Sequence, residues 1–380
     1  MKAYKFKLKV SKTIKRKLEE TLSVCCEIYN AALQERRDAW QLNRISINYH
    51  AQSAQLPEIK LIRDDVNGIY SQILQDVLRR VSKTFDAFFA RVMRGDKAGF
   101  PRFKSVSRFD SFCFPQSGFK LVGDKLTLSK IGSLKLRLSR TIEGRVKTCT
   151  IKREASGWFV IFTAEDAPKL LPKTGKQIGL DVGIESFVTL SDGSAIDNFK
   201  YYETSVKQLR RAQRRVSRRK KGSKGRIKAI VFLQKIHEKI HRQRTDFQHK
   251  ISTNLVKEFD LIAVEALNIK GMSRGILSKQ IYDVAWRSFF SKLKYKAENA
   301  GRELIEVNPS GTSQTCVCGA TVKKDLSVRW HCCKVCGLSE HRDSVSAKII
   351  LSRAGQTRKD VTYALTQSVF LESPTHSLQA

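Results

Sequence analysis

The chain has 380 residues and is strongly basic, with 71 lysines and arginines, 36 aspartates and glutamates, and a formal net charge of +35. Its length allows two or three domains, and a hydrophobic fraction of 41% excludes a disordered protein. So large a charge excess destabilises a compact fold unless a polyanion neutralises it, so we expect a nucleic-acid partner. No apolar run approaches the ~18 residues of a membrane span, and the N-terminus alternates instead of forming a signal peptide. We therefore expect no membrane partner and a location in the cytoplasm, or in a nucleus if the host cell has one.

The first half of the chain is predicted to be a small β-structure interrupted by helices. Residues 3–10 alternate between apolar side chains and lysines, as in a half-buried strand with a basic outer face. Apolar residues then recur at helical spacing from 12 to 95, which predicts a helical insertion. After a loop rich in aromatics and cations at 99–115, short strands with polar turns resume. They indicate a small barrel or sandwich, which the first strand joins.

A different architecture is expected after a linker that contains Pro168, Pro172 and Gly175. The segment IGLDVGIESFVTLSDG predicts two strands of a hairpin. Residues 203–258 are the most basic stretch and predict a helical hairpin. A buried strand, a helix and a further strand follow, and this alternation indicates an α/β sheet. Residues 353–380 are polar without clear periodicity and predict a flexible tail.

Three acidic residues far apart in the chain could act together. Asp181 directly follows the apolar run of a predicted strand, Glu265 ends another such run, and Asp343 lies at the start of a predicted helix. If the two strands are neighbours, their carboxylates emerge side by side and the helix can supply the third. Such oxygen ligands suit Mg²⁺ or Mn²⁺, and two of these ions can hydrolyse a phosphodiester. Any one of the acids is more often a turn former or a helix cap, so the prediction rests on the three together.

Five of the nine cysteines lie close together in a pattern typical of a zinc site. The second pair has the C-x-x-C-G spacing that wraps one Zn²⁺, and the first pair is one residue shorter. A site with four protein ligands is closed, so we expect the zinc to be structural and not catalytic. The predicted ligands are Cys316, Cys318, Cys333 and Cys336, with His331 and Cys332 as alternatives.

Together, the motifs GLDVGIESF, VEALNIKGM, TSQTCVCGA and HRDSVSAKIIL resemble those of the TnpB (OrfB) proteins. These are transposon-encoded proteins related to compact type V CRISPR effectors. GFPRFKS and the basic helical hairpin also match, and the resemblance spans about residues 1–351. It implies that Asp181, Glu265 and Asp343 occupy the family's three catalytic positions.

The resemblance also implies a fold of class α/β + β. A RuvC-type, RNase H-like nuclease domain would contain an inserted zinc ribbon, and a small wedge β-barrel carrying a helical recognition insertion would precede it. The implied boundaries are 1–11 and 96–170 for the wedge barrel, 12–95 for the helical recognition insertion, 176–310 and 340–352 for the nuclease domain, and 311–339 for the zinc ribbon.

The implied activity is RNA-guided, Mg²⁺-dependent cleavage of double-stranded DNA beside a short transposon-adjacent motif. It implies a guide RNA from the transposon end and a target DNA as partners, and a prokaryotic cytoplasm with nucleoid association on DNA. The sequence does not decide between a monomer and a dimer, and we favour a monomer. Basic residues of the helical hairpin would neutralise phosphates. The candidates are Arg210, Arg211, Arg214, Arg215, Arg218, Arg219, Lys220 and Lys221.

The chain departs from the family pattern beside two of the acids. His341 and Val345 stand where the family has an acid and an amide, and Ala266 stands where an aspartate often follows the glutamate. Because all three acids are present, we expect an active enzyme. Two alternatives share the same motifs, namely an RNA-guided DNA-binding regulator without cleavage and a transposase-type strand-transfer protein.

Overall fold

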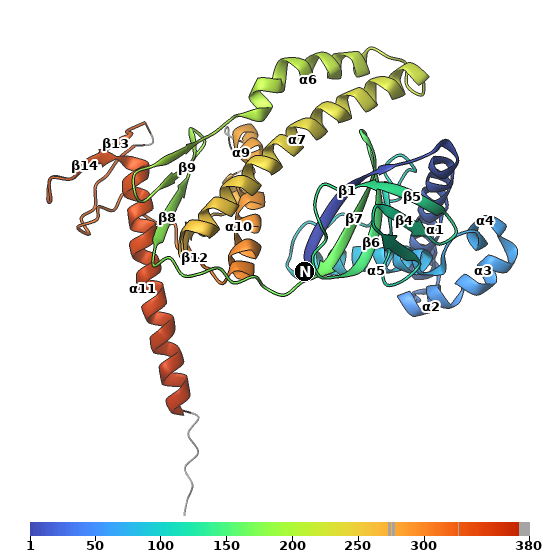
Figure 1. Ribbon diagram of the computed structural model, residues 1–380, viewed down its shortest axis with the longest axis horizontal. Coiled ribbons are helices and arrows are strands. Elements are labelled where there is room, and N and C mark those ends of the chain that lie inside the picture. Colours follow the sequence, from blue (N-terminus) through green and yellow to red (C-terminus); the bar gives the residue numbers. More distant parts are fainter. Residues whose placement is uncertain (273–274, 276–277, 326, 372–380) are drawn as a thin grey trace, which may run out of the picture. The chain divides into compact units, whose positions relative to one another are not determined.

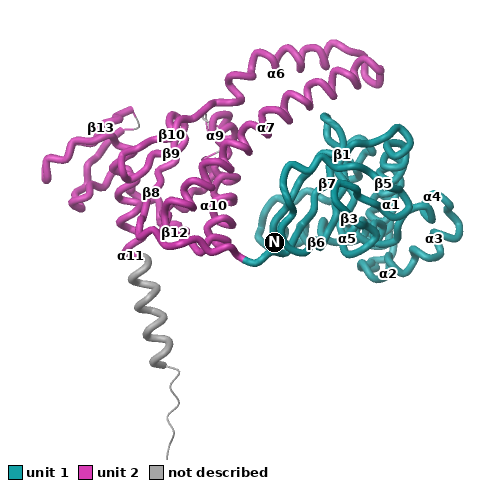
Figure 2. Tube along the Cα trace, in the orientation of Figure 1, with its two compact units in different colours: residues 1–167 teal, residues 168–380 magenta. Residues whose placement is uncertain are grey.

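The computed structural model of the chain divides into two compact units, residues 1–167 and 168–380 (Figure 2). It describes residues 1–272, 275, 278–325 and 327–371, without side chains for 270 and 357–371. Each unit has its own sheet and its own hydrophobic core. Along this described part of the chain, no helix is long and apolar enough to cross a bilayer.

Unit 1 is built around a curled antiparallel sheet of seven strands. In pairing order these are β2 (Ser111–Phe114), β6 (Arg145–Glu154), β7 (Gly157–Glu165), β1 (Lys2–Lys9), β5 (Gly132–Arg137), β4 (Lys125–Leu128) and β3 (Phe119–Val122). The predicted alternation of β1 is confirmed, since Tyr4, Phe6 and Leu8 are buried and the lysines between them are exposed. The edge strands β2 and β3 form no ladder, although the ring centroids of Phe114 and Phe119 are 6.4 Å apart. The expected barrel is therefore a half-barrel with two open edges.

Helices between β1 and β2 share the core of this sheet (Figure 1). They are α1 (Lys12–Asn43), α2 (Tyr49–Ala54), α3 (Leu56–Ile62), α4 (Asp64–Asn67) and α5 (Ser71–Met93). The hydroxyl of Ser11 caps α1 by accepting a hydrogen bond from the backbone N–H of Ile14. Both α1 and α5 pack on β2, and α1 packs on α5. They occupy the segment in which the sequence predicted helices.

Unit 2 contains a five-stranded mixed sheet. In pairing order its strands are β10 (Ala195–Asp197), β9 (Ser186–Leu190), β8 (Gln177–Val182), β11 (Leu261–Glu265) and β12 (Glu303–Val307). The predicted hairpin is confirmed as β8 and β9, whereas β11 runs parallel to both β8 and β12. The sheet therefore changes from antiparallel to parallel pairing at β8. In open α/β sheets, ligands bind beyond the carboxyl ends of the strands where the topology changes.

Helices connect these strands and cover both faces of the sheet (Figure 1). They are α6 (Tyr201–Ser217), α7 (Lys224–Glu258), α8 (Ile269–Met272), α9 (Ser278–Val284), α10 (Trp286–Ala300) and α11 (Arg342–Leu371). Ile262 and Val264 of β11 belong to a core cluster with α7 and α10. Leu261 and Ala263 of the same strand belong to a cluster with α11. Successive side chains of β11 thus face different helices, as expected for a central strand.

A small hairpin of β13 (Trp330–Cys332) and β14 (Ser339–His341) lies between β12 and α11. β14 continues into α11 without a loop, and the backbone N–H of Arg342 donates to the carbonyl of Arg329 at 2.8 Å. α11 reaches Leu371, so the segment predicted as a flexible tail from 353 is helical up to that residue. Ala354 of this segment is buried against the sheet. Residues 372–380 lie outside the described residues.

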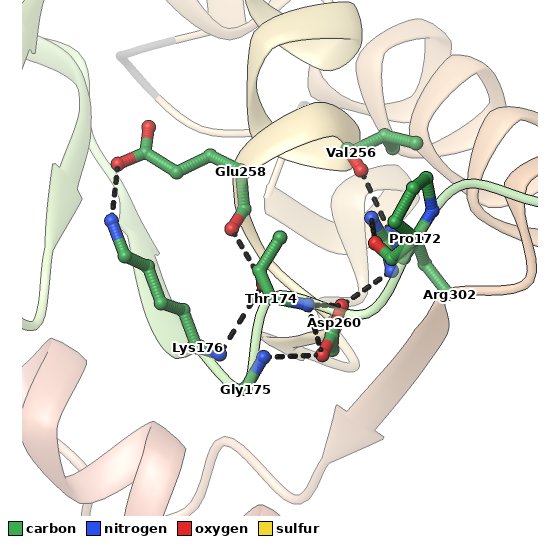
Figure 3. A network of polar contacts seen from close by, with 8 residues as sticks. All are labelled: Pro172, Thr174, Gly175, Lys176, Val256, Glu258, Asp260 and Arg302. Carbon is green, nitrogen blue, oxygen red and sulfur yellow. Dashed lines mark hydrogen bonds and ion pairs between the residues drawn. The ribbon is translucent and has the colours of Figure 1, made fainter.

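A polar network joins the starts of β8, β11 and β12 (Figure 3). The buried guanidinium of Arg302 donates to two backbone carbonyls and pairs with Asp260. Asp260 also accepts hydrogen bonds from the backbone N–H groups of Thr174 and Gly175. Thr174 and Gly175, and then Arg302, lower the pKa of Asp260. The linker and three strand starts therefore depend on one ion pair.

Replacing Arg302 by alanine is expected to lower the free energy of unfolding by about 3–5 kcal/mol, because it removes the donor from buried carbonyls and from Asp260. The matched control is Lys176→Ala, which removes an exposed ion pair to Glu258 from the same network and should cost less than about 1 kcal/mol. Urea unfolding at neutral pH measures both values. Equal effects of the two substitutions would contradict a central role for Arg302.

Candidate active site

Asp181 and Glu265 lie at the same edge of the unit 2 sheet, because they stand near the carboxyl ends of two parallel strands. In the register of β8 and β11, Leu180 is opposite Val264, so the next residue of each strand is one of the two acids. The sequence left open whether these strands are neighbours, and the sheet order shows that they are. By strand alternation, both acids share the face on which α11 packs.

A glycine brings helix α11 close to this edge. Gly179 lies two residues before Asp181, and a Cβ built on Gly179 would be 2.0 Å from the carbonyl oxygen of Ala347 on α11. Any larger residue would collide with the helix backbone, so this close approach requires glycine. Asp343 lies one helical turn before Ala347, which places it above the end of β8 and near Asp181.

The electrostatics show that the three acids interact. The pKa of buried Asp181 is raised well above its ordinary value, first by burial and then by the nearby charges of Glu265 and Asp343. The guanidinium of Arg342 opposes this shift. Burial also raises the pKa of Glu265. The site therefore brings together three carboxyl groups whose simultaneous ionisation is unfavourable until a cation compensates it.

Thr312 belongs to this site, although the sequence analysis did not identify it. Its buried hydroxyl donates to Oε1 of Glu265 at 2.5 Å, which orients the carboxylate and lowers its pKa. Arg353 also lowers the pKa of Glu265, and it donates to the backbone carbonyls of Asn308 and Ser310. It thereby holds the loop that carries Thr312. Thr312 stands in the motif TSQTCVCGA, in which only the cysteines supported a chemical prediction.

Within the described side chains, the group of metal-binding residues whose ligand atoms all lie within 4.8 Å of one another consists of cysteines only. The acidic site is therefore defined by strand register, by the position of Asp343 on α11 and by the electrostatic interaction of the three carboxyl groups.

The residues that depart from the family pattern have different environments. His341 remains beside Asp343, since its Nδ1 is 4.0 Å from Oδ2 of Asp343 and accepts the backbone N–H of Asp343 at 3.4 Å. Val345 is buried, so an apolar contact replaces the polar group of the family at this position. Ala266 is exposed, and its backbone N–H donates to the carbonyl of Val307. These changes leave the position of Asp343 on α11 intact.

Four cysteine sulfurs meet beside the β13–β14 hairpin. The sulfur of Cys316 is 3.6 Å from that of Cys336, and the sulfur of Cys318 is 3.7 Å from that of Cys333. Four thiolates at about 2.3 Å from a tetrahedral ion would be about 3.8 Å apart, so the set fits a metal of that geometry. Backbone N–H groups of Cys336 and Val335 lower the pKa of the Cys333 thiol to about 6, whereas burial raises the pKa of the Cys316 thiol to about 12. The sulfur positions, and not these pKa shifts, therefore indicate the metal site.

The two alternative ligands lie outside this set. Cys332 is exposed, and its sulfur is 3.5 Å from the hydroxyl of Ser339. His331 is fully buried, and its Nδ1 is 2.5 Å from Nζ of Lys324. The short spacing of the first cysteine pair therefore does not force either residue into the cluster.

The eight basic candidates for phosphate binding lie on α6 and in the turn after it, and all are exposed. Helices α6 and α7 pack through a small apolar core of Leu209, Ala212, Ile236 and Ile240. Arg226, which the sequence analysis did not single out, donates to the carbonyls of Val216 and Arg219 and fixes the turn. A surface cavity of about 570 Å³ is lined by Arg211, Arg214, Arg215, Arg218 and Arg219.

Three family models match parts of the chain. The OrfB_IS605 model, described as "Probable transposase", matches residues 161–275. A model described as "Cas12f1-like, TNB domain" matches residues 286–350, and one described as "Helix-turn-helix domain" matches residues 1–44. This last segment folds here as strand β1 and the single long helix α1.

Relatives match nearly the whole chain. A protein of Streptomyces pristinaespiralis described as "Putative RNA-guided DNA endonuclease" is 34% identical over 365 residues, which cover 92% of this chain and 89% of the relative. The chain belongs to the TnpB (OrfB) family. InsQ of Escherichia coli K12, described in the same words, matches this TnpB chain with 28% identity over 93% of this chain and 92% of the relative.

A solved structure shares the fold of this TnpB-family chain. The "Cryo-EM structure of the Cas12f1-sgRNA-target DNA complex" contains a chain that superimposes with a TM-score of 0.58 at 15% sequence identity. The match covers 90% of this chain and 83% of the other. At this identity the similarity establishes the common fold alone.

Replacing Gly179 by alanine in this TnpB-family chain is expected to displace α11, because the added Cβ would lie 2.0 Å from the carbonyl oxygen of Ala347. Such overpacking should cost about 1–3 kcal/mol of stability. Gly355→Ala, on the same helix with no atom within 4 Å of the added Cβ, is the control and should be neutral or slightly stabilising. Thermal unfolding and limited proteolysis measure the effect. A Gly179→Ala variant that matches wild type in both would contradict it.

Without divalent cations, Asp181→Asn is expected to raise the unfolding temperature at neutral pH. The folded-state pKa of Asp181 is raised, so the folded chain binds this proton more tightly than the unfolded chain does. The stabilising contribution of that proton is present below the unfolded pKa and is lost as the pH rises through the folded pKa. Asparagine does not ionise and avoids the loss.

We expect a gain of about 2–4 °C that grows from pH 5 to pH 8 in thermal scans with EDTA. Asp197→Asn, at an exposed position of β10, serves as the control. Added Mg²⁺ should stabilise wild type and not Asp181→Asn. A pH-independent effect of the substitution would contradict the prediction.

Proposed function

We propose that this chain is an RNA-guided endonuclease that cuts double-stranded DNA beside a short transposon-adjacent motif. The observation that carries the proposal is the meeting of Asp181, Glu265 and Asp343 at one sheet edge, in a chain with a net charge of +35. The names of its near full-length relatives describe an RNA-guided DNA endonuclease. They favour cleavage over the two alternatives, a non-cleaving regulator and a strand-transfer protein.

The nuclease domain would be of the RuvC type with an RNase H-like fold and would comprise most of unit 2. Three consecutive antiparallel strands followed by two parallel strands support this assignment, since they place two of the acids at the topological switch of the sheet. Unit 1 would be the wedge half-barrel with its helical recognition insertion. The half-barrel and the helices between β1 and β2 support that reading.

Asp181, Glu265 and Asp343 would hold two Mg²⁺ or Mn²⁺ ions, which prefer carboxylate oxygens. When bound, such a pair supplies an activated water and stabilises the leaving oxygen of the phosphodiester. Thr312 keeps the Glu265 carboxylate in one orientation, and Arg353 holds the Thr312 loop. Because burial raises the pKa of Asp181, protons and cations would compete for its carboxylate, and cation affinity should increase with pH.

Cys316, Cys318, Cys333 and Cys336 would hold one Zn²⁺, and the sulfur distances support this assignment. Because four thiolates close the coordination sphere, the zinc would have a structural role. The ribbon it stabilises ends in β14, which continues directly into the helix that carries Asp343.

A guide RNA would read the target by base pairing, while the protein binds the phosphates of the heteroduplex. The exposed arginines of α6 supply cations for that contact. All three acids and the cysteine cluster come from one chain, so a monomer would contain a complete site. Acting on DNA, the protein would work in the prokaryotic cytoplasm, associated with the nucleoid.

The test of the proposed function is cleavage of a plasmid library with a randomised adjacent motif, by protein co-expressed with its flanking locus and a guide. We expect cut ends beside one enriched motif for wild type and a loss of at least about 1,000-fold for Asp181→Ala, on the order of that seen when a group of a catalytic unit is removed. Asp197→Ala should cut like wild type. Site-specific DNA binding without cut DNA ends would favour the non-cleaving regulator. Products in which DNA strands have been joined would favour the strand-transfer protein.

Phosphate binding by α6 has its own test in the salt dependence of guide RNA affinity. Changing Arg211, Arg214, Arg215 and Arg218 to glutamine should reduce the slope of log affinity against log salt by about 0.7–0.9 for each phosphate that the variant no longer neutralises. The matched control changes four exposed cations of α1, which are Lys12, Lys15, Arg16 and Lys17. Filter binding at several salt concentrations measures the slopes. Equal slopes for the two variants would contradict a special role for α6.

A further inference from the structure

A cavity borders the acidic edge and reaches the face of the unit 2 sheet that α10 covers. It measures about 400 Å³ and shares Glu265 with the acidic site. Val264 also lines it, and Val264 faces α10, whereas Glu265 lies on the face covered by α11. The cavity therefore starts at the acids and extends over the end of β11 toward α10. Its volume lies in the range of pockets that hold a small organic ligand, which includes a nucleotide.

Arg287 supplies a cation to this cavity. It lies in the first turn of α10 and is exposed. No ion pair joins it to a carboxylate among the described residues, although Glu306 of β12 lines the same cavity. Its guanidinium is free to bind a phosphate with two parallel hydrogen bonds.

Phe290 supplies a flat apolar surface three residues further along α10, and thus on the same side of the helix as Arg287. Its ring is partly buried and packs on Phe289, with the centroids 5.8 Å apart, so its orientation is fixed by the core. Glu306 adds a hydrogen-bond acceptor. A cation, an aromatic ring and an acceptor in one cavity match the phosphate, the π-face and the amino edge of a nucleotide.

We propose that this cavity receives the nucleotide next to the cleaved phosphodiester. Arg287 binds its phosphate, Phe290 stacks on its base, and Glu306 accepts a hydrogen bond from a base amino group. The inference rests on the proposed endonuclease function. Because the guide reads the target by pairing, these residues position the cut strand and contribute to the cleavage rate and not to target affinity. Thymine has no exocyclic amino group, so it is the least favoured base at this position.

The test uses the complete protein with its guide RNA and a target duplex whose cut position has been mapped. Single-turnover cleavage in Mg²⁺ is compared with target affinity measured in the Asp181→Ala background. Arg287→Ala and Phe290→Ala should slow cleavage about tenfold or more, the size expected for one stacked base or one phosphate contact, while target affinity changes less than about twofold. Phe290→Tyr should recover most of the rate, whereas Arg287→Lys keeps the charge without the two parallel hydrogen bonds and should recover only part of it. Lys294→Ala, an exposed cation further along α10, is the matched control.

A second readout does not depend on cleavage. A target carrying 2-aminopurine beside the mapped cut should lose fluorescence on binding to the Asp181→Ala protein, and should keep it when Phe290→Ala is added. Placing thymine at that position should reduce the cleavage rate of wild type by a larger factor than it reduces the cleavage rate of the Glu306→Gln variant.

The outcomes separate the two proposals. A wild type that cuts nothing would overturn the endonuclease function. A wild type that cuts, with rates unchanged by both Arg287→Ala and Phe290→Ala, would overturn the nucleotide cavity alone. Equal losses of target affinity and of cleavage would also overturn it, because the residues would then act in target binding.

Discussion

The close contact between Gly179 of β8 and Ala347 of α11 is the constraint on which the acidic edge depends. Strand register alone brings Asp181 beside Glu265. The third acid lies on a helix, and the distance of a helix from a sheet depends on the side chains between them. With no side chain at Gly179, α11 comes close enough for Asp343 to interact with Asp181. At the opposite ends of the same strands, the Arg302 network fixes where each strand starts.

This chain has two sites at which like charges lie close together and are neutralised only by a bound partner. The acids of unit 2 lie in a buried site that raises the pKa of Asp181, so ionisation is unfavourable until cations bind. The arginines of α6 repel one another until a polyanion neutralises them. Both arrangements lower the stability of the free protein, which is the usual relation between a functional site and the fold that carries it. Binding of cations and of nucleic acid should therefore stabilise the chain by mass action.

The features that the sequence predicted well are those that depend on local patterns of apolar and polar residues. The alternation of Tyr4, Phe6 and Leu8 was sufficient to predict β1, and helical spacing was sufficient for α6 and α7. The apolar runs before Asp181 and Glu265 were sufficient to predict the strands that carry these acids, although not the pairing of the two strands. What could not be predicted depends on long-range approach. Thr312 donates to a carboxylate 47 residues away in sequence, and nothing in its local pattern indicates that contact.

The open half-barrel of unit 1 could not be predicted for the same reason. Closure of a barrel depends on whether two edge strands meet and not on the sequence pattern of either strand. The helical end of α11 was missed because its polar composition resembles that of a tail, although Ala354 still packs on the sheet. The cavity beside Glu265 combines residues of β11, α10 and β12, and their convergence exists only in the folded sheet.

The direct passage from β14 into α11 has a consequence for the order in which the molecule is made. Translation delivers Asp181 and Glu265 first, and Asp343 emerges only after the cysteine ribbon that precedes it. The helix that closes the acidic edge is also the last element of the described chain. A nascent polypeptide therefore carries two acids without the third while residues 266–342 are made. The acidic edge is completed only after the cysteine ribbon has been made, so a product truncated before Asp343 contains the basic surface of α6 without a complete set of carboxylates.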